Sequence, residues 1–423
     1  MEFKEHIEEE YGLKVANDLL NALNRTSSHA LLLNTEKISI EDFQKQFPHI
    51  KNHPYIPNAF LYDKNEYDLG KSIYHDAGAI YISDASALMV AYVLNANKDD
   101  VVLDMCAAPG GKSIQTSILM QNAGVIVAND LSYNRALVLS QNVERTGRKN
   151  IVVISNDLSK NRFPMNSFSK IILDAPCSGS GMFRKENKML DDWSIEKVKK
   201  QAEIQKQLID LAYSYLCEGG ELIYSTCSFS KEENFMVVSY LLNKYDDIHV
   251  VSLTNYKNIS LTPINEGITL SYSSFCGEGQ YFCLLKKDGK MPILNAINED
   301  YIKEIQFKNL NLKGKLIKKN NALYLSPTNI NLTKFNVVRN GLKLGEQIKD
   351  NFIPDYHLSH FLPSTTSIVL SYEEAKKYLH GDTINLDVSK GFHLVSYLGL
   401  NLGFVKASNG QLKNHYPKGL RHN

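Results

Sequence analysis

Two cysteines in similar surroundings are the first candidates for chemistry. Cys177 lies within Asp174–Gly179 (DAPCSG), and Cys227 lies within Ser225–Ser228 (STCS). Each follows an apolar, β-branched run, so each is expected at the end of a strand. A single strand-end cysteine is most often an inert core residue, but an ionised thiol is a strong nucleophile. The polar turns around these two cysteines favour the reactive interpretation.

Two thiols beside a methyl donor suit one class of reaction. A thiolate that adds to C6 of a cytosine makes C5 nucleophilic enough to accept a methyl group. The C5 proton then leaves and the thiolate is eliminated. Asp174 is the candidate acid for N3 of the base. The residues alone do not decide which of Cys177 and Cys227 attacks.

The elements that must position these residues form a regular alternation. Apolar runs at 101–104, 125–130, 151–157, 170–177 and 221–227 are separated by segments able to form helices. This pattern predicts an α/β fold with a doubly wound, mostly parallel sheet. Ligands bind beyond the carboxyl ends of such strands. The polar residues at the strand ends are therefore expected to gather along one edge.

The loop after the first of these strands is the candidate cofactor site. Residues 104–113 read DMCAAPGGKS, whose small residues let a ligand approach the backbone, and the following helix N-terminus favours an anionic group. A nucleotide-binding P-loop would need glycine where Cys106 stands, and G-x-G-x-x-G is absent. The sequence therefore disfavours both a nucleoside triphosphatase and an NAD-binding protein.

Two further strand-end acids refine the choice of cofactor. Asp130 could accept the hydroxyls of a ribose, and Asp157 could contact an adenine amino group. Either acid alone could instead cap the next helix. Together with the glycine-containing loop they predict an adenosine-containing cofactor without a phosphate cradle, which S-adenosylmethionine satisfies.

Other segments give weaker expectations. Residues 1–22 are predicted to form one amphipathic helix. A helix ending at Gly219-Gly220 is predicted to follow the fourth strand, and Ser230 with Glu233 is predicted to form the capping box of the next helix. Residues 248–253 and 280–287 are expected to complete the sheet.

Charge is distributed unevenly along the 423 residues. The net charge is −6 over residues 1–95, zero over 96–287, and +7 over 288–423. The last range reads as a small β-rich domain, and its lysines are either an RNA-facing surface or ordinary solvated side chains. No apolar run approaches the ~20 residues of a membrane span, and no secretory signal is expected. The six cysteines show no zinc-type spacing, which favours a reduced cytosolic compartment and no metal site.

Three motifs together resemble a known family. Residues 105–113, 174–181 and 224–228 resemble the signature motifs of the RsmB/RsmF (Sun-type) RNA 5-methylcytosine methyltransferases. Residues 78–86 resemble the segment that leads into the methyltransferase core of that family. Residues 413–421 resemble the C-terminal signature of the RsmF branch, which modifies 16S rRNA in the small-subunit decoding region.

The resemblance implies an architecture and a partner. It implies a class I, Rossmann-like S-adenosylmethionine methyltransferase domain over 96–287. An accessory RNA-binding α+β domain would precede it over 1–95, and a PUA-like RNA-binding region would follow over 288–423. The expected partner is RNA, as 16S rRNA or the 30S subunit, with no DNA and no membrane. A cytoplasmic location and a monomeric state are expected.

The resemblance also implies roles for single residues. Cys227 would be the nucleophile, and Cys177 would assist release of the methylated product. The cofactor-binding residues would be Cys106, Ala107, Ala108, Pro109, Gly110, Gly111, Lys112, Asp130, Asp157 and Asp174. Arg184, Lys185 and Lys188 are candidates for contacts with RNA phosphates. A tRNA substrate, or an RNA-binding assembly factor with secondary catalysis, are the alternatives.

Overall fold

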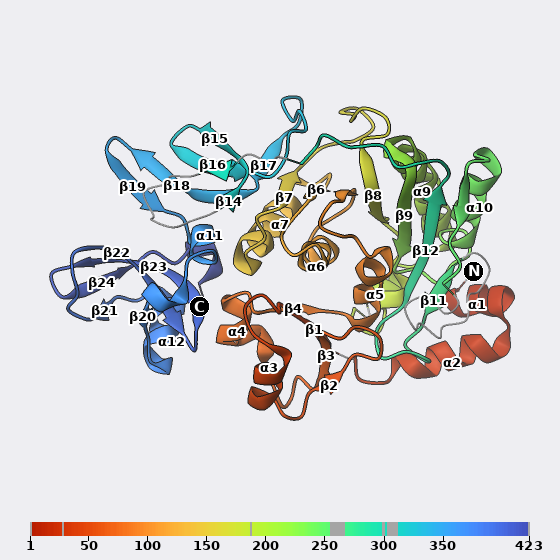
Figure 1. Ribbon diagram of the computed structural model, residues 1–423. Coiled ribbons are helices and arrows are strands. Elements are labelled where there is room, and N and C mark those ends of the chain that lie inside the picture. Colours follow the sequence, from red (N-terminus) through yellow and green to blue (C-terminus); the bar gives the residue numbers. More distant parts are fainter. Residues whose placement is uncertain are drawn as a thin grey trace.

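A mixed sheet of nine strands lies at the centre of the computed structural model (Figure 1), which describes residues 2–27, 29–186, 188–253, 267–297, 301–302 and 312–421. The strand order is β10-β12-β9-β8-β5-β6-β7-β17, with β11 paired to β12. The strands are β5 (Val101–Asp104), β6 (Val125–Asn129), β7 (Ile151–Ile154), β8 (Phe168–Asp174), β9 (Leu216–Thr226), β10 (Ile248–Val250), β11 (Ile268–Leu270), β12 (Gln280–Lys287) and β17 (Val337–Asn340).

The order of the parallel strands reverses at one point. Strands β7, β6, β5, β8 and β9 are parallel to their neighbours, and the outer strands are antiparallel. The chain runs from β5 to β6 and β7, then returns to the other side of β5 as β8. Open α/β sheets bind ligands at such a switch point. The predicted doubly wound, mostly parallel α/β fold is confirmed.

Helices cover both faces of this sheet. One face carries α5 (Ala85–Leu94), α6 (Gly111–Leu119) and α7 (Tyr133–Thr146), and the other carries α9 (Ile195–Tyr215) and α10 (Phe235–Lys244). Side chains alternate along each strand. In β5, Val102 packs in the first layer, whereas Val101 and Leu103 pack in the second. Burial on both faces explains why the parallel strands are almost wholly apolar.

The N-terminal region has two helices and a small antiparallel sheet. The helices α1 (Phe3–Tyr11) and α2 (Leu13–Leu23) are followed by the sheet β2-β3-β1-β4. Its strands are β1 (His29–Leu33), β2 (Lys51–Asn52), β3 (Ala59–Tyr62) and β4 (Ile80–Ser83), and its helices are α3 (Ile40–Gln46) and α4 (Ile73–Asp76). The single helix predicted over 1–22 is wrong, because Gly12 has φ +85° and interrupts it.

The C-terminal region contains two further antiparallel units. The first is a four-stranded sheet of β15 (Lys315–Lys319), β16 (Ala322–Ser326), β18 (Leu342–Ile348) and β19 (Asn351–Pro354). The second is the mostly antiparallel sheet of β20 (Ile368–Val369), β21 (Ile384–Asn385), β22 (Gly391–Tyr397), β23 (Leu400–Ser408) and β24 (Gln411–Asn414), with α11 (Tyr356–Ser359) and α12 (Tyr372–His380). The remaining short elements are α8 (Lys188–Asp191), β13 (Tyr301–Ile302) and β14 (Leu312–Lys313).

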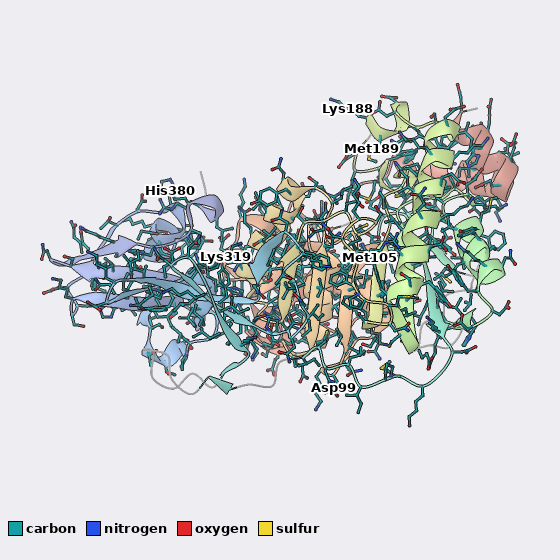
Figure 2. All side chains as sticks on the ribbon, turned by 90° about the horizontal axis from the view of Figure 1, so that it is seen from above. Asp99, Met105, Lys188, Met189, Lys319 and His380 are labelled. Carbon is teal, nitrogen blue, oxygen red and sulfur yellow. The ribbon has the colours of Figure 1, made fainter. Side chains whose placement is uncertain are left out.

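The C-terminal region is attached to the rest of the molecule in two places. Strand β17 extends the central sheet by pairing with β7. In addition, Leu31 and Phe60 of the N-terminal sheet share one apolar core with Tyr378 of α12 and Val395 of β22. Figure 2 shows the resulting elongated molecule, with His380 toward one end and Lys188 toward the other.

Two of the predicted helix ends are wrong. Helix α9 ends at Tyr215, and the segment with Gly219-Gly220 belongs to β9, because that stretch pairs with β8 and β12. Helix α10 begins at Phe235 after Asn234, so Ser230 and Glu233 form no capping box. The Glu233 side chain turns into the protein interior instead. None of the helices in the described ranges is long and apolar enough to cross a bilayer.

The attachment of β17 depends on a buried ion pair. Arg339 is 8% exposed, and its guanidinium donates to Glu144 Oε2 at 2.7 Å and to Ser140 Oγ at 2.8 Å. We expect Arg339→Ala to lower the free energy of unfolding by about 3–5 kcal/mol, since it leaves a buried carboxylate unpaired. Urea denaturation would measure this, with the exposed Lys318→Ala as control. Equal stability of the two variants would contradict the prediction.

Candidate active site

A cavity of about 340 Å³ opens at the switch point between β5 and β8. This volume lies in the range of small-molecule sites. The central sheet, with the loop and helix that follow β5, contributes Asp104, Cys106, Ala107, Ala108, Pro109, Gly111, Lys112, Gln115 and Asp174. The N-terminal sheet contributes His29, Tyr81, Ile82 and Ser83. The site is thus formed by two parts of the chain, of which the sequence identified only one.

The loop after β5 owes its shape to backbone contacts and glycine. The Ala107 N–H donates to the Asn129 carbonyl at 2.7 Å, which ties the loop to the end of β6. Gly110 has φ +117°, and a Cβ there would lie 2.9 Å from Leu139 Cδ1. The positive φ favours glycine at this position, and a larger residue would also have to displace the Leu139 side chain. Helix α6 starts at Gly111 and presents its unbonded N–H groups at the cavity.

Asp104 is a buried carboxylate with an unused oxygen. Its side chain is fully buried, and Ser113 Oγ donates to its Oδ2 at 2.6 Å. Its Oδ1 is buried and has no hydrogen-bond partner among the described residues. Burial raises the pKa of Asp104 to about 7, against the opposing effect of the Ser113 hydrogen bond. A cationic donor, such as the ammonium group of an amino acid, would satisfy this oxygen.

Asp174 and Lys112 form a pair at the edge of the cavity. Lys112 Nζ lies 2.7 Å from Asp174 Oδ2, and Ser225 Oγ donates to Asp174 Oδ1 at 2.7 Å. Burial alone would lower the pKa of Lys112, but the charge and hydrogen bond of Asp174 raise it above its usual value. The pair is held in place, and both residues line the cavity.

The two cysteines meet beside this pair. Cys177 Sγ and Cys227 Sγ are 3.2 Å apart although the residues are 50 positions apart in the chain. Both thiols are free and partly buried. The hydrogen bond with Cys227, followed by burial, raises the pKa of Cys177 well above its usual value. The arrangement can supply one attacking sulfur and one neighbouring S–H group.

Two residues that sequence reasoning missed hold the cysteine loops together. We call Ala175–Gly179 the Pro-Cys loop and Cys227–Ser230 the Thr-Cys loop. The Glu233 carboxylate accepts hydrogen bonds from Ser178 of the first and Ser228 of the second, and Gln205 Nε2 also donates to it at 3.1 Å. The sequence pointed to Glu233 only as a capping-box partner of Ser230 close to the Thr-Cys motif, not as a link between the loops. Nothing in the sequence pointed to Gln205, which comes from α9.

Asp130 directly follows β6, whereas Asp157 lies in the loop beyond the end of β7 at Ile154, and neither residue lines the cavity. Asp130 Oδ2 accepts from the Ala108 N–H at 3.3 Å, and its Oδ1 accepts from the Ser132 N–H at 3.0 Å. Asp130 therefore supports the loop over 105–110 between β5 and α6, which we call the cofactor loop. The Asp157 carboxylate turns back on its own loop and accepts from Ser159 N at 3.0 Å. Their expected contacts with ribose and adenine stay predictions.

Of the three basic residues expected to meet phosphates, two are engaged within the protein. Arg184 forms a buried ion pair with Glu278 at 2.8 Å, so its guanidinium is already neutralised. Lys185 Nζ lies 3.2 Å from Asp84 Oδ2 and borders the cavity. The exposed Lys188 lies on α8 and points away from the body of the molecule in Figure 2.

Comparison with family models covers most of the chain. Residues 91–274 match the model of 16S rRNA methyltransferase RsmB/F. Residues 1–85 match the N-terminal domain of 16S rRNA methyltransferase RsmF, 300–362 its first C-terminal domain, and 365–422 its PUA domain. The shared core described above thus joins the N-terminal domain to the PUA domain.

Solved structures resemble the central part of the chain. A methyltransferase homologue from Pyrococcus horikoshii is 28% identical, with a TM-score of 0.57, and covers 67% of this chain and 93% of its own. The structure of NSun6 from the same organism with SFG has a TM-score of 0.62 at 22% identity, and covers 68% of this chain and 98% of its own. The second likeness shows the fold alone.

Curated relatives extend over nearly the whole chain. Ribosomal RNA small subunit methyltransferase F of Shewanella piezotolerans is 30% identical over 95% of this chain and 93% of its own length. The proteins of the same name from Vibrio parahaemolyticus and Vibrio cholerae are 29% and 30% identical, each with the same coverage. The cavity is lined by residues of the motifs that carry the family resemblance. Together with that site, these matches show that the chain belongs to the RsmF family of small-subunit ribosomal RNA methyltransferases, whose members use S-adenosylmethionine.

Proposed function

We propose that this protein methylates C5 of a cytosine in the 16S rRNA of the small ribosomal subunit, with Cys227 as the covalent nucleophile. One observation carries the chemistry: two thiols 3.2 Å apart stand beside a cavity lined by the cofactor loop and the Lys112–Asp174 pair. The choice of RNA follows from the relatives, which are named for the small-subunit ribosomal RNA.

The residues of the cavity fit S-adenosylmethionine. The unpartnered Asp104 Oδ1 suits the ammonium group of the methionine part, and the N-terminus of α6 suits its carboxylate. Cys106–Lys112 would surround the ligand, with Asp174 beside it, and Asp130 and Asp157 are proposed to reach its ribose and adenine. When bound, the cofactor supplies an electrophilic methyl group.

The chain's own residues supply the remaining steps. The Cys227 thiolate adds to C6, and Asp174 with its partner Lys112 supplies a proton toward N3, so that electron density moves to C5. After methylation the C5 proton passes to a solvent water, its bonding electrons restore the 5,6 double bond, and the C6–S bond breaks with its electrons on sulfur. N3 then returns its proton to the Asp174–Lys112 pair. The Cys177 S–H, 3.2 Å away, is placed to protonate the departing sulfur and assist release.

The C-terminal region is proposed to hold the RNA. It matches a PUA domain and carries the net charge of +7. Lys406 and Lys413 lie opposite each other on β23 and β24, a like-charge pair that costs stability in a bare sheet. A phosphate between them would remove this cost. The proposed domains are an accessory domain over 1–95, the methyltransferase domain over 96–287 and the C-terminal region over 288–423. We further propose that the protein binds RNA and not DNA, and that it acts as a monomer in the cytoplasm.

Substrate choice can be tested directly. The protein would be incubated with tritiated S-adenosylmethionine and, separately, with unmethylated 30S subunits, free 16S rRNA and tRNA. We expect label in 30S subunits or 16S rRNA and none in tRNA. Label confined to tRNA would overturn the rRNA assignment, and absence of label from all three would overturn the enzymatic one.

Substitution of each cysteine distinguishes their roles. We expect Cys227→Ala to abolish methyl transfer, because it removes the proposed nucleophile. Cys177→Ala should instead accumulate a covalent protein–RNA adduct, seen as a slowly migrating band on a denaturing gel. The buried Cys283→Ala is the control and should form no such band. An adduct in Cys227→Ala but not in Cys177→Ala would reverse the two assignments.

Cofactor binding depends on Asp104. Loss of its charge in Asp104→Asn should weaken S-adenosylmethionine binding by roughly 10- to 100-fold, the effect of a charge-assisted hydrogen bond. Calorimetric titration would measure the dissociation constant. The exposed Asp99, near the amino end of the same strand (Figure 2), provides the matched Asp99→Asn control. Equal affinities for the two variants would remove Asp104 from the site.

RNA binding by the C-terminal region predicts a change in salt dependence. Replacing the exposed Lys406, Lys413 and Lys418 with glutamine should reduce the slope of log K against log salt by about 2–3, if each contacts a phosphate. The same changes at Lys45, Lys64 and Lys71 of the acidic N-terminal region serve as control. Filter binding with 16S rRNA would measure both slopes, and an unchanged slope in the first set would make these lysines ordinary surface.

A further inference from the structure

Glu233 is a buried carboxylate at the centre of the two cysteine loops. It is 0% exposed. Its Oε1 accepts from the Ser178 N–H at 2.7 Å and from Gln205 Nε2 at 3.1 Å. Its Oε2 accepts from Ser178 Oγ and Ser228 Oγ, each at 2.5 Å. All four donors point at one carboxylate. Burial raises the pKa of Glu233, and these hydrogen bonds oppose that effect.

The contacts of Glu233 bracket both cysteines. Ser178 and Ser228 are the residues that directly follow Cys177 and Cys227. Gln205 Nε2 also donates to the Pro176 carbonyl at 2.8 Å, so the Pro-Cys loop is held on both sides of its cysteine. The Gly181 N–H donates to the Cys227 carbonyl at 2.8 Å. One carboxylate thus ties together the two loops whose sulfurs must share one substrate.

We propose that Glu233 is a positioning residue that locks the Pro-Cys loop to the Thr-Cys loop and thereby sets the separation of the Cys177 and Cys227 sulfurs. It touches neither sulfur according to these contacts and acts through Ser178 and Ser228. The proposal builds on the roles given to the cysteines above for its enzymatic meaning, but the geometry it claims can be measured without RNA.

The charge of Glu233 has a second effect on the same loop. It is one of the negative groups, after the hydrogen bond and burial, that raise the pKa of Cys177. The thiol form of Cys177 is the one placed to protonate the departing sulfur. Removal of the charge should therefore shift the ionisation of Cys177 to lower pH, which a purely structural role would not require.

Two substitutions separate geometry from charge. Glu233→Ala removes all four contacts. Glu233→Gln keeps the shape and lets the amide oxygen accept from Ser178 N and Gln205, while its NH₂ group donates to the two serine hydroxyls in place of accepting from them. The neighbouring Glu232→Gln is the matched control, since Glu232 faces His6 of α1, 3.6 Å away, and not the cysteine loops.

The separation of the sulfurs can be read from oxidation by diamide. Diamide takes two electrons and two protons from the two thiols, a disulfide forms, and the reagent becomes the hydrazine. Peptide mass spectrometry would measure the rate at which the Cys177–Cys227 disulfide forms. We expect this rate to fall about tenfold or more in Glu233→Ala and to recover partly in Glu233→Gln. S-adenosylmethionine affinity should stay within about twofold in all variants, because Glu233 lies outside the cofactor cavity.

The charge effect is read from the pH dependence of alkylation. In the Cys227→Ala background, iodoacetamide modification of Cys177 should rise at lower pH when Glu233→Gln is added, and should not move with Glu232→Gln. Unchanged linkage in Glu233→Ala would overturn the positioning role. A second result would also overturn the positioning role. If Glu233→Ala loses cofactor binding while Glu233→Gln keeps the wild-type rates of disulfide formation and alkylation, Glu233 has only a general role in folding.

Failure of this proposal differs from failure of the proposed function. If wild-type protein transfers no methyl group to any RNA, the linkage and alkylation rates still report on Glu233. If methyl transfer occurs and Glu233→Ala retains the wild-type linkage rate, the function stands and the positioning role falls.

Discussion

The site depends on strand β8 lying between β5 and β9 in parallel register. Asp174 at the end of β8 is paired with Ser225 of β9, and Asp104 at the end of β5 is paired with Ile172 of β8. Parallel strands end at the same edge, so the three loops that follow them start side by side. The cofactor loop, the Pro-Cys loop and the Thr-Cys loop are neighbours for this reason, and a shift in register would separate them.

The fold takes several charged or ionisable groups out of water, and three of them have partners that offset this cost. Lys112 is paired with Asp174, Glu233 receives four hydrogen bonds, and Arg339 is paired with Glu144. Asp104 differs from these groups, because one of its oxygens is buried without a hydrogen-bond partner in the described residues. An uncompensated buried polar atom is costly, and the proposed cationic ligand would remove that cost at Asp104.

The parts around the catalytic sheet are built into it. Strand β17 comes from the C-terminal region and pairs with β7, and the N-terminal sheet shares its core with the PUA domain. Tyr81 and Ser83 of the N-terminal sheet line the cavity itself. An RNA held by the basic C-terminal region would therefore meet a surface whose distance from the cysteines is fixed by packing.

The sequence by itself determined the α/β fold, the strand ends that carry chemistry, and the family, because apolar periodicity and motif residues are local properties. It failed where distant contacts override local signals. Ser230 and Glu233 have the spacing of a capping box, yet four donors from α9 and the cysteine loops draw the carboxylate inward. The sequence predicted that Arg184 contacts RNA phosphates, but its guanidinium is neutralised by Glu278, which lies 94 residues away in the chain. Only the tertiary structure could decide which acids face the cavity, since Asp104, Asp130 and Asp157 all stand at or shortly after the ends of apolar runs in the sequence and only Asp104 lines the cavity.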